Sequence, residues 1–118
     1  MANILIIDDD PSVCQFLCDL MLLEGYSPIS ALDLNQGQKL FKDADLVLLD
    51  FNLGNGTGAD LLATARLEGH ATPVIVITGS HDLGAVKACM ADLGVFAYLP
   101  KPPSVKQLSA LVRSILTN

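Results

Sequence analysis

Three adjacent aspartates, Asp8, Asp9 and Asp10, directly follow the apolar segment of residues 4–7. Like charges placed side by side at the end of a buried strand repel one another and do not stabilise a fold. A bound divalent cation relieves this repulsion, and hard carboxylate oxygens suit Mg²⁺, Mn²⁺ or Ca²⁺. The pattern predicts a metal site that includes Asp8 and Asp9, whereas capping of the following helix explains Asp10.

Other chemically active side chains stand at the ends of further apolar segments. Asp50, Thr78 and Lys101 each lie at or just beyond the carboxyl end of such a segment. If these segments are neighbouring strands, one crevice holds several acids, a hydroxyl and an ammonium group. Acids that bind a metal, with a lysine and a hydroxyl to neutralise phosphoryl oxygens, are typical of phosphoryl transfer.

The elements that must position these groups are short apolar strands that alternate with helical patterns. This alternation predicts an α/β fold with a parallel sheet covered on both faces. Pro28 lacks an amide hydrogen and therefore places its strand at a sheet edge. The expected fold is a flavodoxin-like, doubly wound (βα)5 fold with a five-stranded parallel sheet in the order 2-1-3-4-5, with its ligand site beyond the carboxyl ends of the strands. The predicted strands are residues 3–8, 26–31, 45–50, 74–78 and 95–99, and the predicted helices are residues 11–24, 34–42, 59–68, 82–93 and 104–116.

The composition fits one domain over residues 1–118. No apolar run reaches the roughly 18 residues of a membrane helix, and no basic residues precede an apolar N-terminal stretch, so we expect a cytoplasmic protein without membrane contact. The net charge of −6 argues against direct nucleic-acid binding by this domain. The three cysteines are an odd number without a Cys-x-x-Cys pair, which argues against a disulfide framework, and Cys14 and Cys18 are interpreted as packing residues.

Four motifs, in this order and spacing, resemble the receiver domain of two-component response regulators over essentially the whole chain. They are Ile6-Ile7-Asp8-Asp9-Asp10-Pro11-Ser12, Leu48-Leu49-Asp50-Phe51-Asn52-Leu53, Val76-Ile77-Thr78-Gly79 and Tyr98-Leu99-Pro100-Lys101-Pro102. The resemblance implies a signalling domain that is not an enzyme, except that it catalyses its own phosphorylation and dephosphorylation.

By this resemblance, Asp50 is the phosphoacceptor, which takes a phosphoryl group from a phosphohistidine on a sensor histidine kinase or a histidine phosphotransfer protein. The resemblance also implies that Asp9 and Asp50 bind Mg²⁺ directly, that Asp8 acts largely through water, and that the main-chain carbonyl of Asn52 completes the protein ligands. Mn²⁺ or Ca²⁺ can substitute for Mg²⁺ in this expectation.

The same resemblance assigns three further roles. Lys101 pairs with the phosphoryl group, Thr78 moves to hydrogen-bond it, and Tyr98 changes rotamer in response. The signal is expected to reach an unknown downstream effector through the surface formed by the fourth helix, the fifth strand and the fifth helix. Val95, Phe96 and Ala97, together with Val86 or Met90, are expected to form an apolar part of that surface.

The first predicted helix carries more apolar side chains than one buried face needs. Two interpretations remain open at this point. The helix is either buried over more of its circumference than usual, or its surplus apolar side chains dock the helical bundle of the kinase, as the resemblance implies.

Other functional classes fit the sequence less well. A metal-dependent phosphatase of the haloacid dehalogenase type would use Asp8, Asp10, Thr78 and Lys101, but its further acids should follow the lysine, and no acid follows Lys101. A flavin-binding electron carrier of the same fold needs a phosphate loop after the first strand, where the aspartates would repel phosphate. A receiver-like protein that only binds partners would not need the complete set of phosphoryl-transfer residues.

Overall fold

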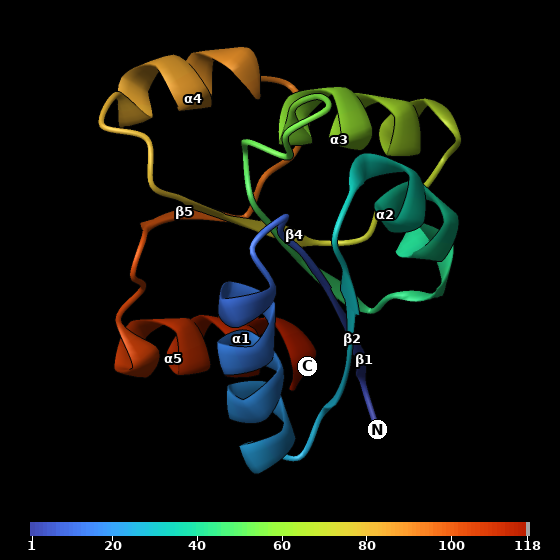
Figure 1. Ribbon diagram of the computed structural model, residues 1–118. Helices are drawn as coiled ribbons and strands as arrows, with labels where there is room; N and C mark the ends of the chain where they lie inside the picture. The colour runs from blue at the N-terminus through green and yellow to red at the C-terminus, as the bar shows by residue number, and fades with distance from the viewer. Residues whose placement is uncertain (118) are drawn as a thin grey trace.

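The computed structural model describes residues 1–117 and contains one parallel sheet of five strands in the order β2-β1-β3-β4-β5. This order confirms the predicted flavodoxin-like fold, in which strands and helices alternate along the chain (Figure 1). The strands are β1 (Asn3–Ile7), β2 (Ser27–Ala31), β3 (Leu46–Leu49), β4 (Val74–Thr78) and β5 (Ala97–Pro100). The helices are α1 (Pro11–Leu23), α2 (Leu34–Leu40), which continues into the short 3-10 helix η1 (Phe41–Asp43), α3 (Gly58–Leu67), α4 (Leu83–Cys89) and α5 (Val105–Leu116).

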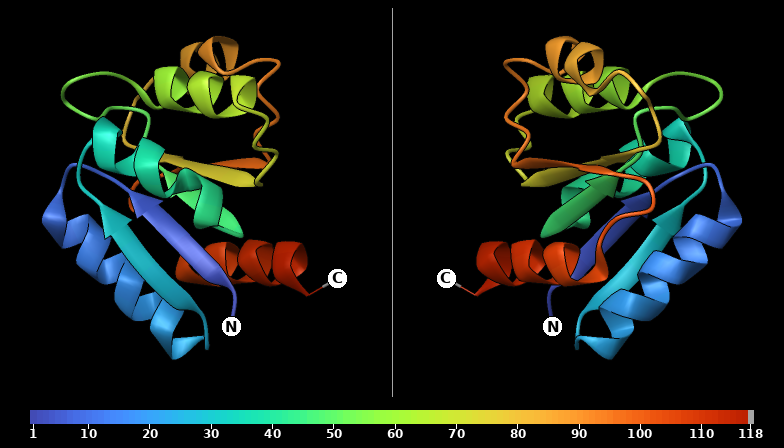
Figure 2. Two further views of the ribbon diagram at one scale, coloured as in Figure 1. Left: turned by 90° about the vertical axis from the view of Figure 1, so that its right-hand side faces the viewer. Right: turned by 90° about the vertical axis from the view of Figure 1, so that its left-hand side faces the viewer.

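The sheet separates two apolar cores. Successive side chains of a strand point to opposite faces, so Ile4 and Ile6 of β1 pack under α1 and α5, whereas Leu5 and Ile7 pack under α2, α3 and α4. Figure 2 shows α1 and α5 on one side of the sheet and α3 and α4 on the other. These four side chains of β1 are fully buried, and each such burial stabilises the fold by about 1.5–3 kcal/mol.

Each helix begins at a side chain that accepts a hydrogen bond from the first turn. The side-chain oxygens of Asp10, Asp33, Thr57, Asp82 and Ser104 cap α1 to α5 in this way. Asp10 accepts from the Ser12 amide, and Pro11 occupies the first helical position, where no amide hydrogen is needed. The predicted capping role of Asp10 is therefore confirmed.

The position of β2 also agrees with its sequence. Pro28 pairs with Ile4 of β1, and β2 is an edge strand of the sheet. A residue without an amide hydrogen disturbs an edge strand less than a central one, because no second ladder of hydrogen bonds depends on it.

The region between α4 and β5 differs from the prediction. Helix α4 ends at Cys89 instead of residue 93, and β5 begins at Ala97 instead of residue 95. Asp92 and Gly94 have φ angles of 69° and 70°, which an α-helix cannot contain. The Arg66 guanidinium also binds the main-chain oxygens of Leu93 and Gly94, which fixes the loop in this conformation.

This loop leaves Phe96 exposed, as expected, but Val86 and Met90 are buried in the core beneath α4. The expectation that either of them adds to the apolar surface is therefore wrong. Val86 lies on the inner face of α4, Met90 directly follows the helix, and both side chains pack into the core. Within residues 1–117, no helix is long and apolar enough to cross a membrane.

Candidate functional site

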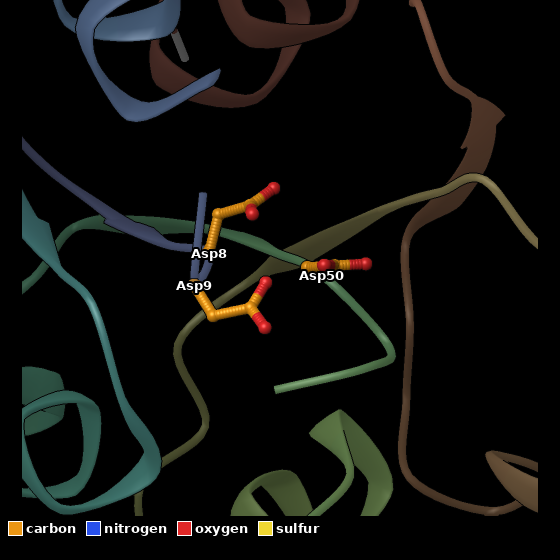
Figure 3. A group of neighbouring side chains, drawn as sticks. All are labelled: Asp8, Asp9 and Asp50. Carbon is orange, nitrogen blue, oxygen red and sulfur yellow. The ribbon is translucent and has the colours of Figure 1, made fainter. Parts of the chain in front are cut away.

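Strand pairing brings the two central acids together. Ile7 of β1 pairs with Leu49 of β3, and the Asp50 amide donates to the Ile7 oxygen at 2.9 Å. The residues that directly follow the two strands, Asp8 and Asp50, therefore lie side by side at the carboxyl edge of the sheet. Figure 3 shows the side chains of Asp8, Asp9 and Asp50 grouped at this edge.

The three predicted acids form one cluster. Each of Asp8, Asp9 and Asp50 offers a carboxylate oxygen, and these oxygens lie within 4.8 Å of one another. Asp8 and Asp50 are buried, whereas Asp9 is exposed. The cluster is therefore open to solvent on the side of Asp9, and a hydrated cation can reach the carboxylates from that side.

Lys101 supplies the positive charge in the cluster. Its Nζ atom lies 2.6 Å from Asp8 Oδ2 and 3.1 Å from Asp50 Oδ2. Its main-chain amide donates to the Thr78 oxygen at 2.9 Å, which ties the residue to the end of β4, and the Lys101–Pro102 peptide bond is cis. Burial disfavours the charged ammonium, but the hydrogen bonds to Asp8 and Asp50 outweigh this effect, so the pKa of Lys101 is raised.

The environment of Asp50 disfavours its charge. Burial has the largest effect, and the neighbouring Asp8 carboxylate adds to it, so the pKa of Asp50 is raised above its usual value. Lys101 and the Asn52 amide, which lies 3.4 Å from Asp50 Oδ1, oppose the shift without cancelling it. The Lys101 ammonium group thus does not offset the combined effect of burial and the Asp8 charge.

Asp8 is held more tightly than Asp50. Its Oδ1 atom accepts from the Asp10 amide at 2.9 Å, its Oδ2 atom accepts from Lys101, and its own amide donates to the Ala31 oxygen at 3.1 Å. Asp10 lies outside the acidic cluster, because its side chain turns toward the first turn of α1.

A further residue near Asp8 was not predicted from the sequence. The Cys14 thiol donates to the main-chain oxygen of Asp8 at 3.3 Å. Burial, and then the Asp8 charge, raise the pKa of Cys14 to about 11, so the thiol is protonated at neutral pH. The available signal was the position of Cys14 in the predicted helix that directly follows the aspartates.

The remaining predicted residues surround the cluster at different depths. Thr78 is buried at the end of β4, and its hydroxyl oxygen accepts from the Ser80 amide at 3.1 Å. Tyr98 of β5 is half-buried under α4, and Lys87 Nζ lies 5.6 Å from the centre of its ring. Asn52 is exposed in the loop after β3 and pairs with Thr57 through an isolated antiparallel bridge.

A groove of about 380 Å³ adjoins the cluster on the side of α1. Most of the side chains along it are apolar, and one of its lining residues is Lys101, which also binds the two buried carboxylates. The residues along the groove are Ser12, Val13, Phe16, Lys101, Pro102 and Pro103. The groove therefore joins the N-terminal half of α1 to the acidic cluster.

Comparison with known proteins identifies the family. The model of the response regulator receiver domain matches residues 4–113. This chain belongs to the response regulator receiver domain family. The receiver is 38% identical over 118 residues to the transcriptional regulatory protein CpxR of Escherichia coli and 30% identical over 117 residues to the cell cycle transcriptional regulator CtrA of Caulobacter vibrioides. These alignments cover 98% and 97% of the receiver but 50% of each regulator, so the chain spans about half the length of these relatives.

Solved structures agree with this family. A CheY-like response regulator receiver domain from Methanospirillum hungatei superposes with a TM-score of 0.89 at 25% identity, covering 99% of the receiver and 94% of that chain. A two-component response regulator from Clostridium difficile gives a TM-score of 0.89 at 28% identity, covering 100% of the receiver and 98% of that chain. The receiver is thus a signalling domain of a two-component system rather than a catalytic enzyme, and such a receiver implies a cognate histidine kinase.

The acidic cluster of the receiver has the donor set of a hard divalent cation. All of its side-chain donors are carboxylate oxygens, which suit Mg²⁺, Mn²⁺ and Ca²⁺ better than softer metals. A cation at Asp8, Asp9 and Asp50 would also favour the charged form of Asp50, against the burial and the Asp8 charge that raise its pKa. The residues present therefore fit a bound Mg²⁺ ion.

Proposed function

We propose that the receiver accepts a phosphoryl group on the Asp50 carboxylate from a phosphohistidine of a sensor histidine kinase or a histidine phosphotransfer protein. The observation that carries the proposal is the position of Asp50, a buried carboxylate at the end of β3 that contacts Lys101 and lies within one cluster with Asp8 and Asp9. A carboxylate is a competent nucleophile toward phosphorus when nearby positive charge neutralises the phosphoryl oxygens.

In the proposed step, one carboxylate oxygen of Asp50 forms a bond to phosphorus while the phosphorus–nitrogen bond of the phosphohistidine breaks. The electron pair of that bond stays on the imidazole nitrogen of the partner. Lys101 orients Asp50 before the transfer and pairs with a phosphoryl oxygen after it. Mg²⁺ held by Asp8, Asp9, Asp50 and the main-chain carbonyl of Asn52 would supply further positive charge against the phosphoryl oxygens.

The hydrogen bonds of the two buried acids favour Asp50 over Asp8 as the acceptor. Both oxygens of Asp8 are bound, one by the Asp10 amide at 2.9 Å and one by Lys101 at 2.6 Å. The contacts to Asp50 are longer, at 3.1 Å from Lys101 and 3.4 Å from the Asn52 amide. Asp50 therefore loses weaker hydrogen bonds than Asp8 would when one of its oxygens bonds to phosphorus.

Incubation with Mg²⁺ and acetyl phosphate tests this assignment. The receiver should gain one phosphoryl group that is stable in acid and labile in base, and mass spectrometry of its peptides should place the group on Asp50. Asp50→Ala should abolish labelling, whereas Asp19→Ala, which removes an exposed acid of α1, should not change it. Full labelling of Asp50→Ala would refute the assignment, and a phosphoryl group on Asp8 would indicate the phosphatase alternative.

The exposed side of α1 supports the docking interpretation of its apolar side chains. Cys14, Leu17 and Met21 form the buried face, whereas Phe16 is 46% exposed and Leu23 is 85% exposed. The surplus apolar side chains are therefore not explained by deeper burial of the helix. Since Phe16 and Lys101 line the same groove, we propose that the kinase docks its helical bundle there, with its phosphohistidine facing Asp50.

A comparison of two phosphodonors distinguishes an effect on kinase docking from an effect on the phosphoryl-transfer step. Phe16→Asp should slow transfer from a histidine kinase that phosphorylates the wild-type receiver by at least about tenfold, because a buried charge weakens an apolar contact. The same variant should react with acetyl phosphate at the wild-type rate. Leu67→Asp is the matched control, since Leu67 is 89% exposed on α3, away from the groove. Equal rates of transfer from the kinase to Phe16→Asp and wild type would exclude this docking site.

We further propose that phosphorylation switches the surface formed by α4, β5 and α5. The Thr78 hydroxyl has a local bond to the Ser80 amide, which it can exchange for a phosphoryl oxygen on Asp50. Tyr98 lies on the neighbouring strand, where Val76 is its partner, and it packs beneath α4. A shift of Thr78 toward Asp50 would thus open space that the Tyr98 ring can enter.

The ring of Tyr98 reports on this switch directly. The receiver has two tyrosines and no tryptophan, so a Tyr26→Phe background leaves Tyr98 as the sole tyrosine signal. Phosphorylation by acetyl phosphate should change its ring resonances in that background, and Thr78→Val should suppress the change while Asp50 still becomes labelled. A full response of Tyr98 in the Thr78→Val variant would contradict the proposed coupling.

A further inference from the structure

Cys14 joins α1 to the acidic cluster through one hydrogen bond. It lies in the first turns of α1, is 3% exposed, and directs its thiol toward the end of β1. Its Sγ atom is 3.3 Å from the main-chain oxygen of Asp8, and its own amide donates to the Asp10 oxygen at 3.1 Å. The residue is therefore fixed by the helix on one side and contacts the aspartate segment on the other.

The carbonyl that Cys14 binds belongs to the peptide bond between Asp8 and Asp9. The orientation of this peptide plane sets the directions in which both side chains leave the main chain. Within residues 1–117, no other hydrogen bond reaches this carbonyl oxygen. The Asp8 amide is bound separately, by the Ala31 oxygen. The thiol therefore fixes the carbonyl group of Asp8, which forms the peptide bond to Asp9.

We propose that Cys14 is a positioning residue, whose thiol holds the Asp8–Asp9 peptide in the orientation that lets both carboxylates bind a divalent cation together with Asp50. This inference rests on the proposed function, in which these acids hold Mg²⁺. Groups that orient metal ligands without touching the metal commonly change metal affinity by 10-fold to 100-fold when they are removed. A thiol is a weak donor, so the effect of Cys14 belongs at the lower end of this range, at about 10-fold.

Cys18 offers a matched control. It lies one turn further along α1, is partly buried, and packs against the same core as Cys14, away from the acids. Replacing Cys18 with an apolar side chain also changes the packing of α1, although Cys18 is less buried than Cys14. Only the replacement of Cys14 removes a hydrogen bond to the Asp8 carbonyl.

The test measures Mg²⁺ affinity by isothermal titration calorimetry without any phosphodonor. Cys14→Val should raise the Mg²⁺ dissociation constant about tenfold, Cys14→Ser should bring it back to within about twofold of wild type because a hydroxyl also donates, and Cys18→Val should leave it unchanged. Cys14→Ala replaces Cys14→Val if the larger side chain prevents folding. Urea unfolding of each variant without metal separates a loss of stability from a loss of affinity.

Two results would overturn the proposal. One is an unchanged dissociation constant in both Cys14→Val and Cys14→Ala, which would show that the thiol only fills space. The other is a Cys14→Ser variant that binds as weakly as Cys14→Val. Either result leaves the phosphoacceptor role of Asp50 intact, whereas a wild-type receiver that binds no Mg²⁺ would refute both the proposed metal site and the role of Cys14.

Discussion

Replacing Lys101 with methionine removes the cation that lies between two buried carboxylates. Its Nζ atom is 2.6 Å from Asp8 Oδ2 and 3.1 Å from Asp50 Oδ2. At an effective dielectric constant of about 20, each attraction is worth roughly 5–6 kcal/mol before desolvation is counted. Removal of one partner of a buried ion pair costs about 3–5 kcal/mol, because the other charge is left uncompensated. Since 22% of the Lys101 side chain is exposed, we expect a loss of about 3 kcal/mol in the free energy of unfolding.

This loss should depend on pH in a defined direction. Burial, followed by the Asp8 charge, raises the pKa of Asp50, and Lys101 opposes the shift. A raised carboxyl pKa favours folding at low pH, and this contribution disappears as the pH rises through the folded-state pKa. Without Lys101 the pKa of Asp50 rises further, so the stability deficit of Lys101→Met should shrink as the pH falls from about 7 to about 4. Lys101 itself stays charged over this range, because its pKa is raised from a basic value.

Urea unfolding followed by circular dichroism, in buffer with a metal chelator, measures both effects. The loss at neutral pH corresponds to a decrease of about 12 °C in Tm for a chain of this length. Lys106→Met is the matched control, since Lys106 is exposed on α5 and forms no ion pair within residues 1–117. A Lys101→Met variant as stable as Lys106→Met, or a deficit that grows as the pH falls, would refute this account of the cluster.

Two further predictions concern the elements that carry the site. Asp10→Ala should lower the free energy of unfolding by about 1 kcal/mol in urea, because α1 loses its cap, whereas Asp10→Asn should retain most of the stability; equal losses in both variants would contradict the capping role. Gly37→Ala should destabilise the fold by about 1–3 kcal/mol, because the new Cβ atom would lie 2.9 Å from the Cδ1 atoms of Ile7 and Leu61. Gly84→Ala, on the exposed side of α4, should instead raise the stability by up to about 1 kcal/mol, and a stabilising Gly37→Ala would contradict the packing described.

The sequence predicted most of the fold because the decisive signals are local. Each strand is a short apolar run, each helix follows a side chain that can cap it, and Pro28 marks the edge strand. The prediction failed between α4 and β5, where a helical pattern continued to residue 93. The Arg66 guanidinium, which comes from α3, binds carbonyl oxygens in that loop, and such a contact between distant segments leaves no local signal.

The sequence by itself determined which chemical groups the receiver has and at which strand ends they stand, because strand alternation and topology follow from patterns along the chain. Only the tertiary structure decided how each of these groups is held and which of them contact one another. Asp8 is held by Lys101 and by the Asp10 amide, whereas Asp50 has longer contacts and a raised pKa. The Cys14 contact with the Asp8 carbonyl was likewise not predicted from the sequence. The physical reason is that burial, hydrogen-bond length and the balance of charge depend on neighbours that packing brings together.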